Sequence, residues 1–168
     1  RRALGMVLWS GKPGEGNYRI LDSRLKNAAD YVQKHSNVDY TRPKLKEFSK
    51  MVLQLSLYYA GMDIANDYAV TFAGIKCQDE LSAQHCTACI MAAYMNNDAG
   101  PDGEPKKIIP VACENDMYSA LTQLIMHLAT GKPAGFGDFR DVEKGVLYIV
   151  NCGQHPPYFF GTPETDSA

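Results

Sequence analysis

The sequence predicts an α/β fold built on an open, mostly parallel sheet with helices on both faces, a Rossmann-like three-layer arrangement. Short apolar runs that are typical of buried strands alternate with segments whose apolar residues recur every three or four positions, the spacing of an amphipathic helix. This alternation is typical of parallel sheets, whose strands are joined by helices. The balance of 45% hydrophobic and 21% charged residues over 168 residues is that of one folded domain.

The helices come first along the chain. Apolar residues recur at helical spacing over residues 20–35 and again over residues 45–59. Thr41 and Pro43 are suited to the cap and the first turn of the second helix. Gly61 is expected to end that helix, because glycine is the usual residue just beyond a helix C-terminus.

The α/β core is expected over residues 66–160, after a helical part at residues 1–65 and before a polar tail at residues 161–168 that we expect to be frayed. The strands expected in this core are residues 68–75, 108–113, 134–139 and 146–151, and the helices are residues 79–94 and 117–130. The connection between the last two strands is too short for a parallel crossover, so these strands are expected to form an antiparallel hairpin.

Charge and hydropathy argue against several classes of protein. A net charge of −2 and a sequence pI near 6.1 argue against a nucleic-acid-binding domain, which usually carries a basic excess. No apolar run approaches the ~18 residues that a membrane helix needs, and no signal peptide is visible. We therefore expect a cytoplasmic protein whose five cysteines are reduced. Because the chain begins with Arg1, we also expect that it was cut from a longer protein.

Two cysteines form a CxxC motif, Cys86 and Cys89. Such a motif can be a redox pair or half of a zinc site. The sequence has no second CxxC, and the predicted helix over residues 79–94 would turn both thiols toward the core. We favour a structural role, and a thiol redox or zinc protein remains the less favoured alternative.

Four chemically active side chains lie at or shortly after the ends of the predicted strands: Lys76, Glu114, Asp138 and His155. Parallel sheets bind ligands outside the carboxyl ends of their strands, so these residues are the candidates for a site. Each also has a structural interpretation: Glu114 as an acid at a helix N-terminus, Asp138 as a turn residue paired with Arg140, and His155 as a loop histidine between prolines. Two carboxylates at neighbouring strand ends could bind magnesium or manganese, or act as an acid and base pair, and a nearby histidine favours manganese.

Residues 75–141, about 40% of the chain, resemble the L-fucose isomerase family. The most specific part is the Cys-Glu-x-Asp turn at residues 113–116, which Ala-Leu-Thr follows at residues 120–122. The other matching pieces are Ile-Lys-Cys-Gln at 75–78, Asn-Asn-Asp-Ala-Gly at 96–100 and Thr-Gly-Lys-Pro at 130–133, ending at Asp138.

The resemblance implies that Glu114 and Asp138 bind a divalent metal, usually manganese, and move protons between C1 and C2 of an open-chain sugar through an enediol. The related arabinose isomerases add a histidine beyond the second acid, and His155 stands at the matching distance, seventeen residues after Asp138. Lys76 and Asn97 lie in the shared motifs and are expected to bind the sugar. The implied partners are a small sugar substrate and further copies of the full-length protein, with no nucleic acid and no membrane.

The family's enzymes are much longer than this chain, with three domains, and their third metal ligand is a histidine of a C-terminal domain. Their sites are also completed between subunits. We therefore expect this chain to correspond to the central, metal-bearing domain, with an incomplete site and little or no turnover alone. The alternative is a non-catalytic α/β module that binds a sugar or a metal.

Overall fold

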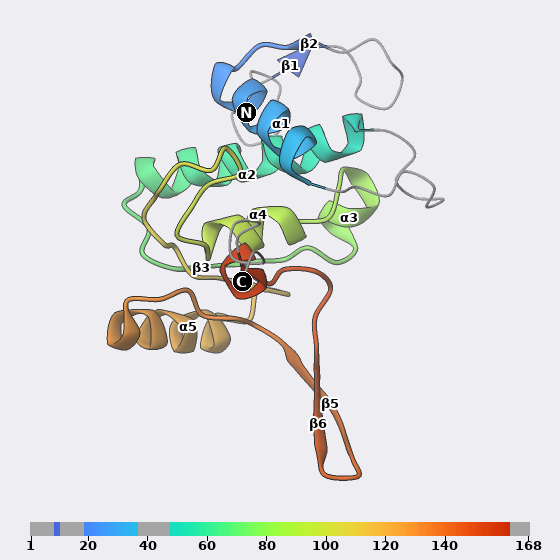
Figure 1. The fold of residues 1–168 in the computed structure, drawn as a ribbon, viewed down its shortest axis with the longest axis vertical. Helices are drawn as coiled ribbons and strands as arrows, with labels where there is room; N and C mark the ends of the chain where they lie inside the picture. Colours follow the sequence, from blue (N-terminus) through green and yellow to red (C-terminus); the bar gives the residue numbers. More distant parts are fainter. Residues whose placement is uncertain (1–8, 11–18, 37–47, 162–168) are drawn as a thin grey trace, which may run out of the picture.

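The first long helix, α1 (Ser23–His35), follows a short antiparallel pair of strands, β1 (Trp9–Ser10) and β2 (Arg19–Ile20). The computed structural model describes residues 9–10, 19–36 and 48–161 (Figure 1). Asp22 caps α1, since its carboxylate accepts hydrogen bonds from the backbone N–H groups of Arg24 and Leu25. The helix buries one apolar face, as its periodicity predicts.

The second helix, α2 (Ser49–Asp67), is longer than predicted. It continues past Gly61, which packs against the end of the Met91 side chain: a Cβ at Gly61 would lie 2.6 Å from the Cε atom of Met91. Gly61 is therefore a packing residue and not a helix terminator. The predicted cap at Thr41 and Pro43 lies outside the described residues.

The parallel sheet consists of β3 (Ala73–Ile75) and β4 (Val111–Cys113). The predicted strand over residues 68–75 is shorter than expected, because α2 ends at Asp67 and Tyr68 is 79% exposed. The crossover contains α3 (Glu80–Gln84) and α4 (Cys89–Met95). The prediction of one helix over residues 79–94 is wrong, since the chain leaves the helical path between α3 and α4.

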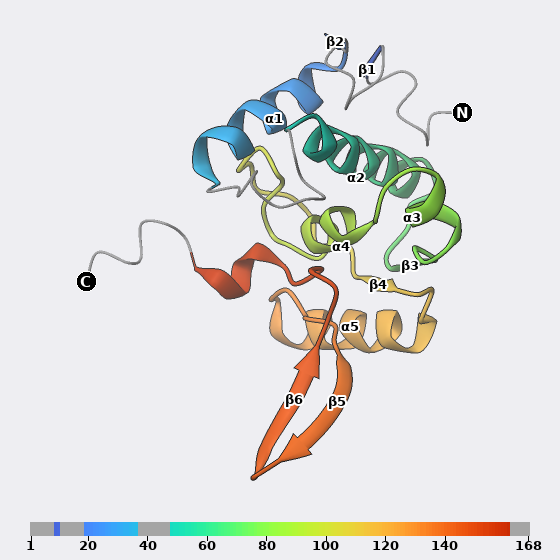
Figure 2. The same ribbon diagram turned by 90° about the vertical axis from the view of Figure 1, so that its right-hand side faces the viewer.

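Helices cover both faces of this strand pair (Figures 1 and 2). Helices α1, α2 and α4 stack on one side, and α5 (Met117–Thr130) lies on the other. The core is buried mainly between α1, α2, α4 and β4. On α5 only Ala120 and Gln123 are buried, so most of its predicted apolar stripe is exposed. Gly131 ends α5 in the left-handed conformation, as expected.

The predicted antiparallel hairpin is confirmed as β5 (Asp138–Glu143) and β6 (Val146–Val150). Its first strand starts later than the expected residues 134–139. Lys144 and Gly145, both with positive φ, form the two-residue turn. The hairpin projects away from the helices, and all of its strand residues are exposed (Figures 1 and 2).

The coarse prediction is thus confirmed: the chain mixes helices and strands, with a small parallel sheet and an antiparallel hairpin. The described strands form separate two-stranded sheets, however, and one continuous open sheet is not seen among them. A short 3-10 helix, η2 (Pro157–Phe160), follows the hairpin, and residues 162–168 of the predicted tail lie outside the described residues. Within the described ranges, no helix has both the length and the apolar character to cross a membrane.

Candidate functional site

Lys76 and Glu114 lie together at the carboxyl end of the parallel strand pair. The paired residues Ile75 and Cys113 end β3 and β4, so the next residue of each strand emerges at the same edge. The Lys76 ammonium forms an ion pair with Glu80, with 2.6 Å between Nζ and Oε1. That hydrogen bond raises the pKa of Lys76, and the negative charge of Glu114 adds to the effect. The sheet edge therefore holds an exposed cluster of one cation and two carboxylates.

The backbone at Glu114 is strained. Glu114 and Asn115 have φ values of 54° and 58°, in the left-handed region that residues with a Cβ rarely adopt. A hydrogen bond from the Asn115 N–H to the Ile75 carbonyl, at 3.1 Å, holds this turn against β3. Such strain is concentrated at functional sites, where a fixed side-chain direction matters more than local stability.

Glu114 does not cap the helix that follows it. The N-cap of α5 is Asp116, whose carboxylate accepts hydrogen bonds from the Ser119 N–H at 3.0 Å and from the Ser119 hydroxyl at 2.7 Å. The Glu114 carboxylate contacts the Cys113 thiol, with 3.6 Å between Oε1 and Sγ. Asp116 therefore fills the capping role that the structural interpretation assigned to Glu114.

The prediction that Asp138 lies at the end of a strand that neighbours the Glu114 strand is wrong. Asp138 is the first residue of β5, opposite Val150, in an antiparallel sheet separate from β3 and β4. Its carboxylate is exposed and forms no hydrogen bond or ion pair with any described residue, so the alternative pairing with Arg140 is absent from the described part of the chain. Because this exposed carboxylate has no partner among the described residues, its oxygen atoms are available to a ligand.

His155 lies against the segment that leads into β5. Its Nδ1 atom is buried and has no hydrogen-bond partner in the part of the chain that the structure describes. A Cβ at Gly135 would lie 3.2 Å from that atom, so the ring packs closely on the backbone three residues before Asp138 and would have to shift slightly to admit a side chain there. An unpaired buried ring nitrogen is costly, and it is a candidate ligand atom.

Cys152 connects this segment with the carboxyl end of β4. Its Sγ atom lies 3.8 Å from the Sγ atom of Cys89. Burial raises the pKa of Cys113, and the nearby Cys152 adds to that shift. The structure thus brings the hairpin base, which carries Asp138, toward the strand end that carries Glu114. Among the described residues, however, no group of three or more His, Cys, Asp or Glu side chains is arranged to hold a metal ion.

Asn97 lies elsewhere, in a hollow of about 580 Å³ lined by Tyr31, Tyr94, Asp98 and Tyr158. The Asn97 amide is largely engaged: its oxygen accepts a hydrogen bond from the Tyr158 N–H at 2.8 Å, and its nitrogen donates to the Ala99 carbonyl at 3.0 Å. The sequence places this asparagine in a polar loop, and its burial depends on tertiary contacts that composition does not reveal.

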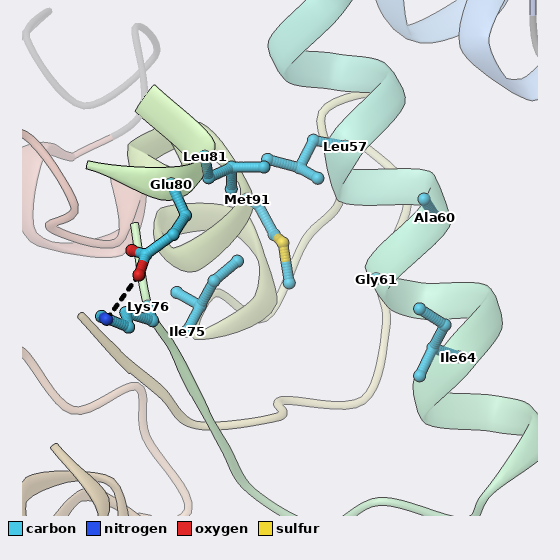
Figure 3. A pocket seen from close by; sticks show the side chains of 9 residues that line it. All are labelled: Leu57, Ala60, Gly61, Ile64, Ile75, Lys76, Glu80, Leu81 and Met91. Carbon is cyan, nitrogen blue, oxygen red and sulfur yellow. Dashed lines mark hydrogen bonds and ion pairs between the residues drawn. The ribbon is translucent and has the colours of Figure 1, made fainter. Parts of the chain in front are cut away.

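A second hollow, of about 420 Å³, opens beside Lys76 (Figure 3). The ion pair of Lys76 with Glu80 lies at one side of it, and apolar side chains of α2, α3 and α4 form the rest of the wall. Those apolar neighbours are Leu57, Ala60, Ile64, Leu81 and Met91, with Ile75 of β3. The sequence analysis did not predict this hollow. The signal available was that apolar residues keep helical spacing on both sides of Gly61, at Leu57, Ala60 and Ile64.

The CxxC cysteines do not lie inside one helix. Cys86 lies in the break between α3 and α4, and Cys89 is the first residue of α4. Burial raises the pKa of Cys86 to about 12 and that of Cys89 to about 11, so both are protonated thiols at neutral pH. Cys77 accepts a hydrogen bond from the Ala88 N–H at 3.2 Å, and all five cysteines are free.

Comparisons of this chain with protein-family models, with curated proteins and with solved structures find no match. The residues and their geometry therefore carry the functional argument.

Proposed function

We propose that the chain is a domain of a divalent-metal-dependent sugar ketol-isomerase that interconverts an aldose and a ketose of the L-fucose or D-arabinose type. The main support is the strained turn at Glu114, which presents a carboxylate beside Lys76 at the carboxyl end of β4. The resemblance of residues 113–116 to the L-fucose isomerase turn supports the same conclusion.

The types of donor atom in this region suit a divalent cation such as manganese or magnesium, and binding would have to draw the side chains together. Glu114 and Asp138 offer exposed carboxylate oxygens, and His155 offers a buried ring nitrogen that has no partner among the described residues. Carboxylates with an imidazole form a set that manganese accepts readily. When bound, the cation supplies positive charge that stabilises the negative charge developing on two adjacent sugar oxygens.

The side chains of this chain then have distinct roles. Glu114 and Asp138 take the proton from one sugar carbon and return it to the next, through an enediol. Lys76 is a hydrogen-bond donor that orients sugar oxygens, and its ion pair with Glu80 holds it at the sheet edge. Asn97 lies in a separate hollow, so its predicted part in sugar binding is not included at this sheet edge.

The fold and assembly belong to the same proposal. The unit β3–α3–α4–β4, with α5 on its second face, is the kind of unit from which Rossmann-like three-layer sheets are built. We propose such a sheet for the whole enzyme, which would be a cytoplasmic homo-oligomer.

Calorimetric titration of the 168-residue chain with manganese tests the proposal. We expect binding by the parent chain and at least a tenfold loss of affinity in Glu114→Gln and in Asp138→Asn. Glu143→Gln is the matched control, because it removes a carboxylate from the same hairpin at the far end of β5 and should leave binding unchanged. If Glu143→Gln reduces binding as much as the other two, the binding is nonspecific and the site assignment is wrong.

A non-catalytic sugar-binding module is the second candidate, favoured by the hollow that contains Asn97. Tyr31, Tyr94 and Tyr158 line it together with Asp98, and aromatic faces beside polar side chains suit a sugar ring. Titration with L-fucose in the absence of metal distinguishes the two. Binding that is lost in Tyr94→Ala but kept in Glu114→Gln favours the module, and binding that requires manganese and Glu114 favours the isomerase.

A further inference from the structure

The thiols of Cys89 and Cys152 lie in contact although 63 positions separate them in sequence, with 3.8 Å between the two Sγ atoms. Cys89 is the first residue of α4, and Cys152 follows the last strand of the hairpin. The pair therefore joins the helical core to the base of the hairpin. It does not involve the CxxC spacing that the sequence suggests.

We propose that Cys89 and Cys152 form a reversible disulfide under peroxide stress, which fastens the hairpin base to α4. A disulfide needs an Sγ–Sγ distance of about 2.05 Å, so the two sulfur atoms must approach by less than about 2 Å, which side-chain rotation with a small backbone shift can provide. This inference rests on the thiol geometry and does not depend on the proposed isomerase activity.

The two thiols differ in access, and this difference sets the order of the steps. Cys152 is exposed, so hydrogen peroxide reaches its sulfur first, oxidises it to a sulfenic acid and leaves as water. The Cys89 sulfur then attacks the Cys152 sulfur, the S–O bond breaks, and the hydroxyl leaves as a second water with the proton of the Cys89 thiol. In sum, two thiols lose two electrons and two protons, and one peroxide is reduced to two waters. Burial raises the pKa of Cys89 to about 11, so this thiol reacts slowly with peroxide itself. In the second step Cys89 reacts through its small thiolate fraction, and its contact with Cys152 compensates for that low fraction.

Cys113 is the competing partner, because its thiol also lies close enough to Cys152 to interact with it. Both thiols interact with Cys152, but Cys113 is only 3% exposed and also contacts the Glu114 carboxylate, whereas Cys89 is half-buried with its Sγ atom 3.8 Å from that of Cys152. We therefore assign the bond to Cys89, and Cys113→Ser is the matched control.

The experiment treats the reduced 168-residue chain with hydrogen peroxide, blocks remaining thiols under denaturing conditions, and maps cross-linked tryptic peptides by mass spectrometry. We expect the thiol count to fall from five to three, with one cross-link between the peptides that contain Cys89 and Cys152, reversed by dithiothreitol. The cross-link should persist in Cys113→Ser and Cys86→Ser and disappear in Cys152→Ser, an exposed substitution that leaves the core intact.

Three results would overturn the proposal. The first is a thiol count that stays at five after peroxide treatment, and the second is a bond that joins Cys86 to Cys89. The third is a bond to Cys152 that disappears in Cys113→Ser and survives in Cys89→Ser. Circular dichroism of each variant confirms that the fold is retained.

Discussion

Replacement of Glu114 by glycine should stabilise the protein relative to replacement by alanine. Both substitutions remove the carboxylate, and the side chain is exposed, so packing changes little in either. They differ in the backbone strain of the folded state. At a φ of 54° the Cβ of alanine lowers the free energy of unfolding by about 1 to 2 kcal/mol, and glycine has no Cβ. Glycine loses about 0.5 to 1 kcal/mol more backbone entropy on folding than alanine does. The balance favours Glu114→Gly over Glu114→Ala by about 0.5 to 1 kcal/mol.

Thermal unfolding followed by circular dichroism measures this difference. For a chain of this length, about 1 kcal/mol shifts Tm by about 2 to 4 °C, so Glu114→Gly should unfold about 2 °C above Glu114→Ala. Lys26 is the matched control, an exposed residue inside α1, where glycine should be about 1 kcal/mol less stable than alanine. Backbone strain at Glu114 is refuted if Glu114→Ala is as stable as Glu114→Gly, or if alanine is the more stable substitution at both Glu114 and Lys26.

Two further predictions concern hydrogen bonds that hold the core. Asn96→Ala should lower the free energy of unfolding, measured in urea, by about 2 to 4 kcal/mol. The buried Asn96 amide accepts a hydrogen bond from the Val111 N–H and donates one to the Val111 carbonyl, and both groups would lose that partner. A loss below about 1 kcal/mol would contradict this prediction. Asp22→Ala should cost about 1 kcal/mol through loss of the α1 cap. The Arg24 hydrogen bond lowers the pKa of Asp22 below its ordinary 3.8, so the unfolded chain binds more protons in acid. The difference between parent and Asp22→Ala should therefore be complete above about pH 4 and shrink as the pH falls further, and a difference that grows in acid would contradict the assignment.

The sequence predicts those parts of the fold that depend on local signals. The period of α1, the Gly131 stop after α5 and the short connection of the hairpin are each encoded within a few neighbouring residues. Features set by distant contacts are missed. The helix over residues 79–94 breaks where Cys77 accepts the Ala88 N–H, a contact between segments that periodicity cannot anticipate.

The candidate site shows the same division. The rule for strand ends predicts that Lys76 and Glu114 are neighbours, and the parallel register confirms it. The left-handed turn at Glu114 has no sequence signal, because glutamate is uncommon in that conformation. Whether Asp138 joins the site depends on where the hairpin base lies. Its position follows from contacts at Gly135 and Cys152 and not from the pattern of the strand itself.

The site and the core occupy different parts of the molecule, which makes binding and stability separable. The buried apolar residues lie mainly between α1, α2, α4 and β4, whereas Glu114 and Asp138 are exposed and the hairpin buries none of its strand residues. Substitutions at the two carboxylates should therefore alter metal binding without lowering the free energy of unfolding. The contact of Cys89 with Cys152 links these two parts directly, so a bond there would restrict the hairpin base while leaving the core packing as it is.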